Sequence, residues 1–84
     1  MKIMFTPNAW EQYLYWQAHD QQMVKRIHRL IEESKRNPFD GIGKPEALKH
    51  EYSGFWARRI TDEHRMVYRV ESDALVIVQL RYHY

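Results

Sequence analysis

The chain has no cysteine, and it has only three glycines and three prolines among its 84 residues. Without cysteine there is neither a disulfide framework nor a thiolate metal site, so packing alone must hold the fold. The low glycine and proline content excludes collagen-like and low-complexity sequence. No apolar run approaches the roughly 18 residues of a transmembrane helix, and the N-terminal apolar stretch is too short for a signal peptide. We therefore expect a cytoplasmic protein.

The chain also has no large excess of charge of either sign. The formal net charge is +2, and residues 1–40 carry 6 basic and 5 acidic side chains against 7 and 6 in residues 41–84. A site for a polyanion must therefore come from charges arranged on one face, because there is no basic tail. The composition, 44% hydrophobic and 14% aromatic, is too apolar for a disordered chain. The length allows one domain, which we assign to residues 1–84.

Two helices are predicted in the first half of the chain, after a short strand at residues 1–5. Thr6 is placed to cap the first helix, and Pro7 suits the first helical position because its fixed φ fits and its missing N–H costs nothing there. Asp20 is placed to cap the second helix. The apolar side chains that recur at three and four residues in this helix are Met23, Val24, Ile27, Leu30 and Ile31. The Asn37-Pro38 pair ends it, because the residue before proline avoids the helical region.

The apolar period changes from helical to two after a loop at residues 37–47. This alternation is typical of strands, and it predicts three of them, at residues 55–61, 65–71 and 75–84. Polar turns separate the strands at residues 62–64 and 72–73. We therefore predict an α+β fold in which the two helices pack on one face of a mostly antiparallel sheet.

Alternation along these strands predicts a cationic face on the side of the sheet away from the helices. In the last strand we assign Val76, Val78, Leu80 and Tyr82 to the helix-covered side, and Ile77, Gln79, Arg81 and His83 to the other. The basic residues gathered on the uncovered side are then Arg59, Arg65, Arg69, Arg81 and His83. This face is either the ordinary solvated side of the sheet or, since like charges on neighbouring strands repel, a surface for a polyanion.

The loop adds Lys44, Glu46, Lys49 and His50 near this face. A carboxylate, arginines and a histidine around a phosphate suit RNA cleavage without a metal. In that reaction a base deprotonates the 2′-OH, arginines stabilise the phosphorane, and an acid protonates the departing 5′-oxygen. The sequence supplies Glu46 and His83 but does not place them together. The histidines show no metal-ligand spacing, and no glycine-rich phosphate-binding motif occurs, so we expect neither a metal nor a cofactor.

Four segments resemble the YoeB toxins, a branch of the RelE-like bacterial toxin superfamily. They are YLYW (13–16), GKPEALKH (43–50), SGFWARRITDEHRMVYRV (53–70) and RYHY (81–84). The resemblance implies a RelE-like microbial-RNase-type fold and a toxin of a type II toxin–antitoxin system. It further implies a ribosome-dependent endoribonuclease that cleaves mRNA in the ribosomal A site and so inhibits translation. The implied partner is a YefM-like antitoxin whose extended C-terminal region covers the active site.

The resemblance also suggests a role for individual residues. Glu46 is implied as the general base and His83 as the general acid, with Arg65 as the clamp on the transition state. Arg59 would make a second phosphate contact, and Tyr84 would position the nucleotide or the His83 ring. The implied contacts to the RNA backbone are Lys44 and Lys49, to which we add Arg81 from the cationic face.

Two other classes of function remain open on the sequence. One is a non-catalytic binding toxin of the same superfamily, such as a ParE-like gyrase poison, and the other is a ribosome- or RNA-binding module that does not cleave. The aromatic side chains of the first helix are compatible with a monomer or a homodimer. We expect no membrane partner.

Overall fold

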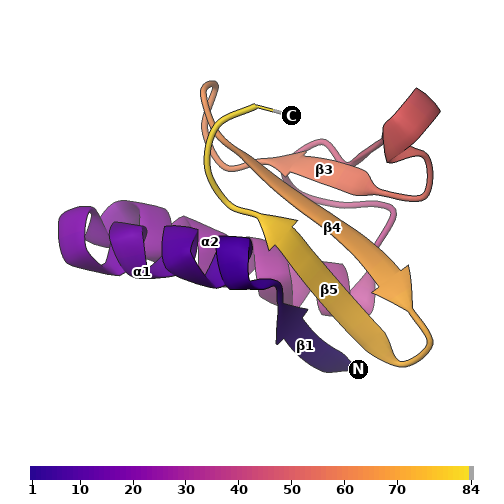
Figure 1. Cartoon of the computed structure of the whole chain (residues 1–84), viewed down its shortest axis with the longest axis horizontal. Helices are drawn as coiled ribbons and strands as arrows, with labels where there is room; N and C mark the ends of the chain where they lie inside the picture. Colours follow the sequence, from indigo (N-terminus) through magenta and orange to yellow (C-terminus); the bar gives the residue numbers. More distant parts are fainter. Residues whose placement is uncertain (84) are drawn as a thin grey trace.

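The computed structural model describes residues 1–83, with two helices on one face of a five-stranded sheet (Figure 1). The elements in chain order are β1 (Lys2–Phe5), α1 (Pro7–His19), α2 (Gln21–Arg36), β2 (Glu46–Ala47), the 3-10 helix η1 (His50–Tyr52), β3 (Trp56–Arg59), β4 (Arg65–Glu71) and β5 (Ala74–Gln79). The strand order is β1-β5-β4-β3-β2; β1 pairs with β5 in parallel, and the other neighbouring pairs are antiparallel. The predicted α+β fold is confirmed. Within residues 1–83, no helix is long and apolar enough to cross a membrane.

Both helices begin at the predicted caps. The Thr6 hydroxyl accepts the N–H of Ala9 at 3.2 Å, and Pro7 opens α1. The Asp20 carboxylate accepts the N–H groups of the first turn of α2 at 3.0 and 3.3 Å, while its own N–H donates to Trp16 at 2.8 Å. A single residue therefore ends one helix and starts the next, which satisfies backbone groups at both ends of the turn. The second helix ends before Asn37, as predicted.

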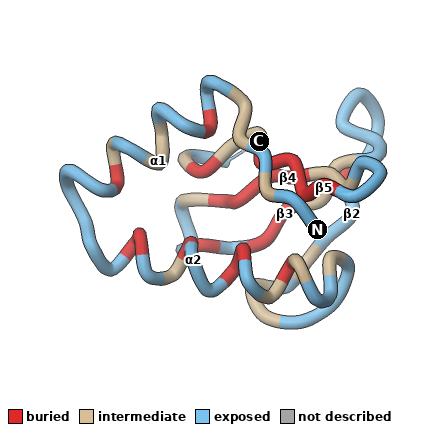
Figure 2. Tube along the Cα trace, turned by 90° about the horizontal axis from the view of Figure 1, so that it is seen from below, coloured by how far each residue is buried: buried red, intermediate tan, exposed pale blue. Residues whose placement is uncertain are grey.

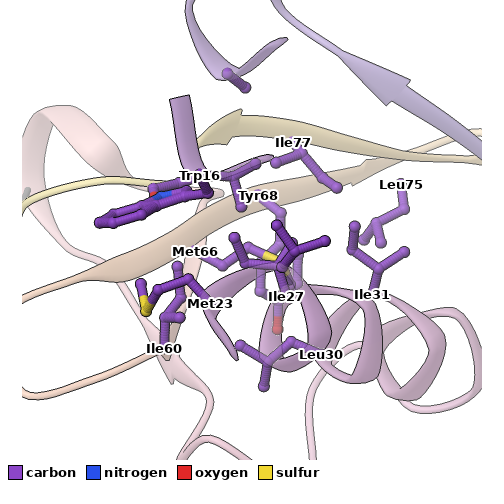
Figure 3. Close-up of a cluster of buried hydrophobic side chains, with 13 residues drawn as sticks. Trp16, Met23, Ile27, Leu30, Ile31, Ile60, Met66, Tyr68, Leu75 and Ile77 are labelled. Carbon is purple, nitrogen blue, oxygen red and sulfur yellow. The ribbon is translucent and has the colours of Figure 1, made fainter. Parts of the chain in front are cut away.

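The main core lies between the helices and the sheet, where the buried segments of both layers face each other (Figure 2). Side chains of α2 meet those of β4 and β5 there (Figure 3), among them Ile27, Leu30, Ile31, Met66, Tyr68, Leu75 and Ile77. A smaller cluster contains Leu48, Ala57 and Val67, packed against Phe55 and Val78. Ala57 and Val67 alternate with residues of the main core, so this cluster lies on the opposite side of the sheet, which we call the open face.

The side of the sheet predicted for residues of the last strand is wrong at three positions, Val76, Ile77 and Val78. Leu75 and Ile77 belong to the main core, so Val76 and Val78 face the other way. From Gln79 onward the predicted faces are correct again, and the strand register explains why. Tyr68 pairs with Ile77 but Val67 pairs with Gln79, so Val78 is an extra residue, a β-bulge. Because a bulge shifts the alternation by one, Gln79 returns to the open face and Leu80 to the core, as predicted.

The last predicted strand is also too long, because β5 ends at Gln79. Residues 80–83, which we call the tail, leave the sheet and turn toward the connection between β3 and β4 (Figure 1). Hydrogen bonds hold the tail there: the N–H of Arg65 donates to the carbonyl of Tyr82 at 3.0 Å. Tyr84 lies outside the described residues.

A buried arginine ties the sheet to the loop that precedes the candidate site. Arg58 is fully buried; its Nε donates to the Tyr68 hydroxyl at 3.0 Å, and its terminal nitrogens donate to the carbonyls of Asn37, Asp40 and Ile42. The Tyr68 hydroxyl in turn donates to Pro38 at 2.6 Å. Burial raises the pKa of Tyr68, outweighing the opposite effect of the Arg58 guanidinium, so the hydroxyl keeps its proton and remains a donor.

Replacing Arg58 with methionine should lower the free energy of unfolding by at least about 3 kcal/mol. The substitution leaves three partly buried carbonyls and the Tyr68 hydroxyl without their donor, and each such group costs roughly 1–3 kcal/mol. Urea unfolding followed by circular dichroism measures the change. The control, Arg29→Met on the exposed face of α2, should stay within about 0.5 kcal/mol of wild type. A loss below 1 kcal/mol for Arg58→Met would contradict the role of this network.

Candidate active site on the open face

Two rows of paired residues cross the open face and carry the predicted site. One row runs Glu46–Ala57–Val67–Gln79 through four strands. The other contains Arg59 and Arg65, which pair directly and lie two residues from Ala57 and Val67, toward the β3–β4 turn. Paired residues point to the same side of a sheet, so Glu46 and both arginines share this face.

Arg65 is the buried member of the arginine pair, with 8% of its surface exposed. One terminal nitrogen, Nη1, donates to the carbonyls of Thr61, Asp62 and His64 at 2.6, 3.0 and 3.2 Å. These contacts hold the guanidinium against the β3–β4 turn and fix the position of its charge. Because the guanidinium is already held in place, little free energy is needed to order it when an anion binds beside it.

Arg59, which pairs with Arg65, and Lys44 on the neighbouring loop are exposed positive charges. The loop reaches β3 through Gly43, whose carbonyl accepts the N–H of Arg59 at 2.7 Å. Gly43 has φ +80°, and a Cβ there would lie 2.8 Å from Leu30, so the close approach requires glycine. The loop is thereby fixed on the edge of β3 immediately before Glu46.

A hollow of about 350 Å³ lies beside the row that begins at Glu46. It is lined by residues 46–50 and by Tyr52 of η1. The exposed side chains of Lys49 and His50 stand on its rim, and His50 holds a left-handed backbone with φ 59°. The hollow therefore combines a carboxylate, a cation and aromatic rings at β2, the strand that pairs with β3.

The tail brings His83 to the same end of the face. His83 is exposed, and its Nε2 donates to the carbonyl of Asp62 at 3.1 Å, in the turn that also holds the Arg65 guanidinium. The amide nitrogen of Gln79 lies 3.0 Å from the His83 carbonyl oxygen. Glu46 and His83 thus flank the arginine pair from two sides.

The remaining two members of the predicted cationic face are engaged elsewhere. Arg81 turns toward α1, where its Cζ lies 3.7 Å from the centre of the Tyr15 ring. The prediction that Arg81 points to the open face is therefore wrong, because the chain has left the sheet before this residue. Arg69 lies on the open face, where it pairs with Glu71 at 2.5 Å and covers the Phe55 ring.

The sequence reasoning missed the side chains that fix the tail. Gln12 accepts the N–H of Leu80 at 2.7 Å, and the indole of Trp16 donates to its carbonyl at 2.9 Å. His64 accepts the N–H of Tyr82 at 2.8 Å. Each lies far from its partner in sequence, and the YLYW segment, which contains Trp16, indicates no contact with the tail.

The arrangement is suited to holding a phosphate between groups that can move protons. Two arginines supply positive charge, one of them prepositioned, and a carboxylate and an imidazole stand on either side. Among residues 1–83, no group of three or more histidine and acidic side chains could hold a metal ion.

Comparisons with known proteins agree with the fold. The model of a family described as "YoeB-like toxin of bacterial type II toxin-antitoxin system" matches residues 5–84. Toxin YoeB of Escherichia coli K12 is 55% identical over 84 residues, which is the whole of both chains. The solved structure of a YoeB/ParE toxin from Agrobacterium tumefaciens has a TM-score of 0.98 and 49% identity, covering all of both chains. A heterotetrameric YoeB–YefM toxin–antitoxin complex from Staphylococcus aureus matches with a TM-score of 0.92 and 45% identity, covering 100% of this chain and 98% of that one.

The two arginines should differ in their effect on stability. Arg65→Gln should lower the free energy of unfolding by about 1–3 kcal/mol, because turn carbonyls lose their donor. Arg59→Gln should stay within about 0.5 kcal/mol, since its side chain is exposed. Urea unfolding of both variants checks this. Equal losses would show that the turn does not depend on the Arg65 guanidinium.

Proposed function

The chain belongs to the YoeB-like toxins of bacterial type II toxin–antitoxin systems, and from this premise we propose that it is a ribosome-dependent endoribonuclease. Its substrate would be mRNA in the ribosomal A site, and cleavage would inhibit translation. The observation that carries the proposal is the arginine pair of the open face with Glu46 on one side and His83 on the other. These are the groups that cleavage by a neighbouring 2′-OH requires.

In the proposed reaction each group has one task. Glu46 takes the proton of the 2′-OH, and the resulting oxygen attacks the adjacent phosphorus. Arg65 and Arg59 stabilise the charge that builds on the phosphoryl oxygens. His83 gives a proton to the 5′-oxygen as the P–O bond breaks, which leaves a 2′,3′-cyclic phosphate and a 5′-hydroxyl. Only side chains of this protein take part in these proton transfers.

Binding and positioning of the message would come from groups around these four. Lys44 and Lys49 are exposed on the loop beside Glu46 and would contact the RNA backbone. The hollow lined by residues 46–50 and Tyr52 is large enough to hold a base next to the scissile phosphate. Arg81, stacked on Tyr15, would support the tail more than it contacts RNA. Tyr84, at the end of the chain, remains a proposed positioning group for the nucleotide or for His83.

The same face is the proposed docking surface of the antitoxin. We expect a YefM-like partner, by analogy with the S. aureus complex, and cytoplasmic action on ribosomes. An acidic, extended segment would match the arginine pair and the lysines in charge and would close the face to RNA. Such a segment can be disordered when free, because its composition buries little apolar surface alone.

Glu46→Gln and His83→Gln should each lower the rate of A-site cleavage by about 10²–10⁴-fold, the usual contribution of a positioned acid or base. The assay incubates the protein with translating ribosomes and maps the 5′ ends of the mRNA fragments. Matched controls are Glu11→Gln and His28→Gln, at exposed positions on α1 and α2, which should cleave at the wild-type rate.

Circular dichroism of every variant separates loss of chemistry from loss of folding. Wild-type cleavage by both site variants would remove the acid–base assignment. Binding to ribosomes with no scission by the wild-type protein would favour a non-cleaving RNA-binding module, and gyrase-dependent DNA breaks would favour a gyrase poison.

A further inference from the structure

The backbone of the tail has a conformation that needs support. Tyr82 has φ 66°, in the left-handed region that a residue with a side chain seldom adopts. Its side chain is 56% exposed, so burial of the ring does not hold it in place. The ring makes contacts with His64 and Arg81, and the backbone of Tyr82 is held by hydrogen bonds. His83 follows directly.

Both backbone groups of Tyr82 bond to the start of β4. Its carbonyl accepts the N–H of Arg65 at 3.0 Å, and its N–H donates to Nδ1 of His64 at 2.8 Å. The first bond is between backbone groups, which most substitutions leave unchanged. The second depends on one side chain, and that side chain is directly next to Arg65 in sequence.

The His64 ring is fixed in the orientation that this bond requires. It is partly buried, and it packs edge-to-face on the Trp16 ring with 4.9 Å between centroids. Trp16 is itself anchored, since its indole N–H donates to Leu80 at 2.9 Å. An imidazole nitrogen accepts a hydrogen bond only without a proton, so the neutral ring carries its hydrogen on Nε2.

We propose that His64 is a positioning residue for His83, acting through the N–H of Tyr82. The inference rests on the proposed function, in which His83 is the general acid. Without the acceptor at Nδ1, the N–H of Tyr82 loses its partner, and the left-handed turn, still held at its carbonyl by Arg65 and by the Gln79 amide, relaxes. His83 then moves relative to the scissile phosphate, and a shift of about 1 Å costs on the order of 10²-fold in rate.

Two substitutions of His64 distinguish the effect of its hydrogen bond from the effect of its volume. In His64→Asn the amide oxygen can take the place of Nδ1 as acceptor, whereas His64→Leu keeps apolar bulk without an acceptor. We expect His64→Leu to lower the single-turnover rate of A-site cleavage by about 10²-fold with little change in affinity for the ribosome. His64→Asn should recover most of the rate.

Two further readouts test the mechanism apart from activity. In the NMR spectrum of the free protein, Nδ1 of His64 should be unprotonated. Hydrogen exchange at the Tyr82 amide should be slow in wild type and His64→Asn and fast in His64→Leu. A variant that is merely destabilised would instead show faster exchange throughout the main core.

The outcomes distinguish this inference from the function on which it rests. If His83→Gln is inactive while His64→Leu cleaves at the wild-type rate, the function stands and the positioning role is overturned. Equal impairment of His64→Asn and His64→Leu also overturns it, because the acceptor then does not matter. If His83→Gln cleaves normally, the general acid was misassigned and both proposals fall.

Discussion

The site depends on how the chain leaves the sheet after Gln79. Backbone polar groups in a segment without strand pairing need other partners, and here side chains provide them. Gln12 and Trp16 of α1 bond both backbone groups of Leu80, and His64 bonds the N–H of Tyr82. The end of the chain, ordinarily the part that is least fixed, is therefore held against the β3–β4 turn by contacts from two other elements. Helix α1 thus helps to position the candidate site as well as forming the core, although it lies on the far side of the sheet.

On the open face, an apolar cluster separates the charged groups. The centre of the face is apolar, with Ala57 and Val67 buried beneath Phe55, and the charged groups stand at the edges of that cluster. Arg65 is fixed by turn carbonyls, while Arg59 and the lysines are exposed and free to adapt to a ligand. In the proposed reaction, the fixed Arg65 would lie at the phosphate and the exposed cations would bind the RNA backbone. This arrangement would suit RNA cleavage, since charge stabilisation depends on preorganisation and backbone binding does not.

The fold was predictable because its signals are local. Thr6, Asp20 and the Asn37-Pro38 pair mark helix ends by backbone chemistry that operates within a few residues, and all three predictions are confirmed. The bulge at Val78 has no such signal, since it arises from pairing with β4, and because of it the assigned faces of Val76, Ile77 and Val78 are wrong. The candidate site was only partly predictable. Alternation placed Arg59 and Arg65 on one face, but the sequence gives no means of bringing Glu46 and His83 to the same pair of arginines. Arg81 was misplaced, and His64 was missed, because the course of the tail is set by partners 18 to 68 residues away.

The central claim is that the 2′-OH of the message is the nucleophile and that Glu46 activates it between the arginine pair and the tail. One measurement tests this most directly: cleavage of a ribosome-bound mRNA with a single 2′-deoxy nucleotide at the scissile position, compared with the all-ribose message. We expect the all-ribose message to yield a 2′,3′-cyclic phosphate, or the 3′-phosphate formed by its hydrolysis, and a 5′-hydroxyl. The deoxy message should bind equally and remain intact. Cleavage of the deoxy message at a comparable rate would show that water is the nucleophile and would contradict the account.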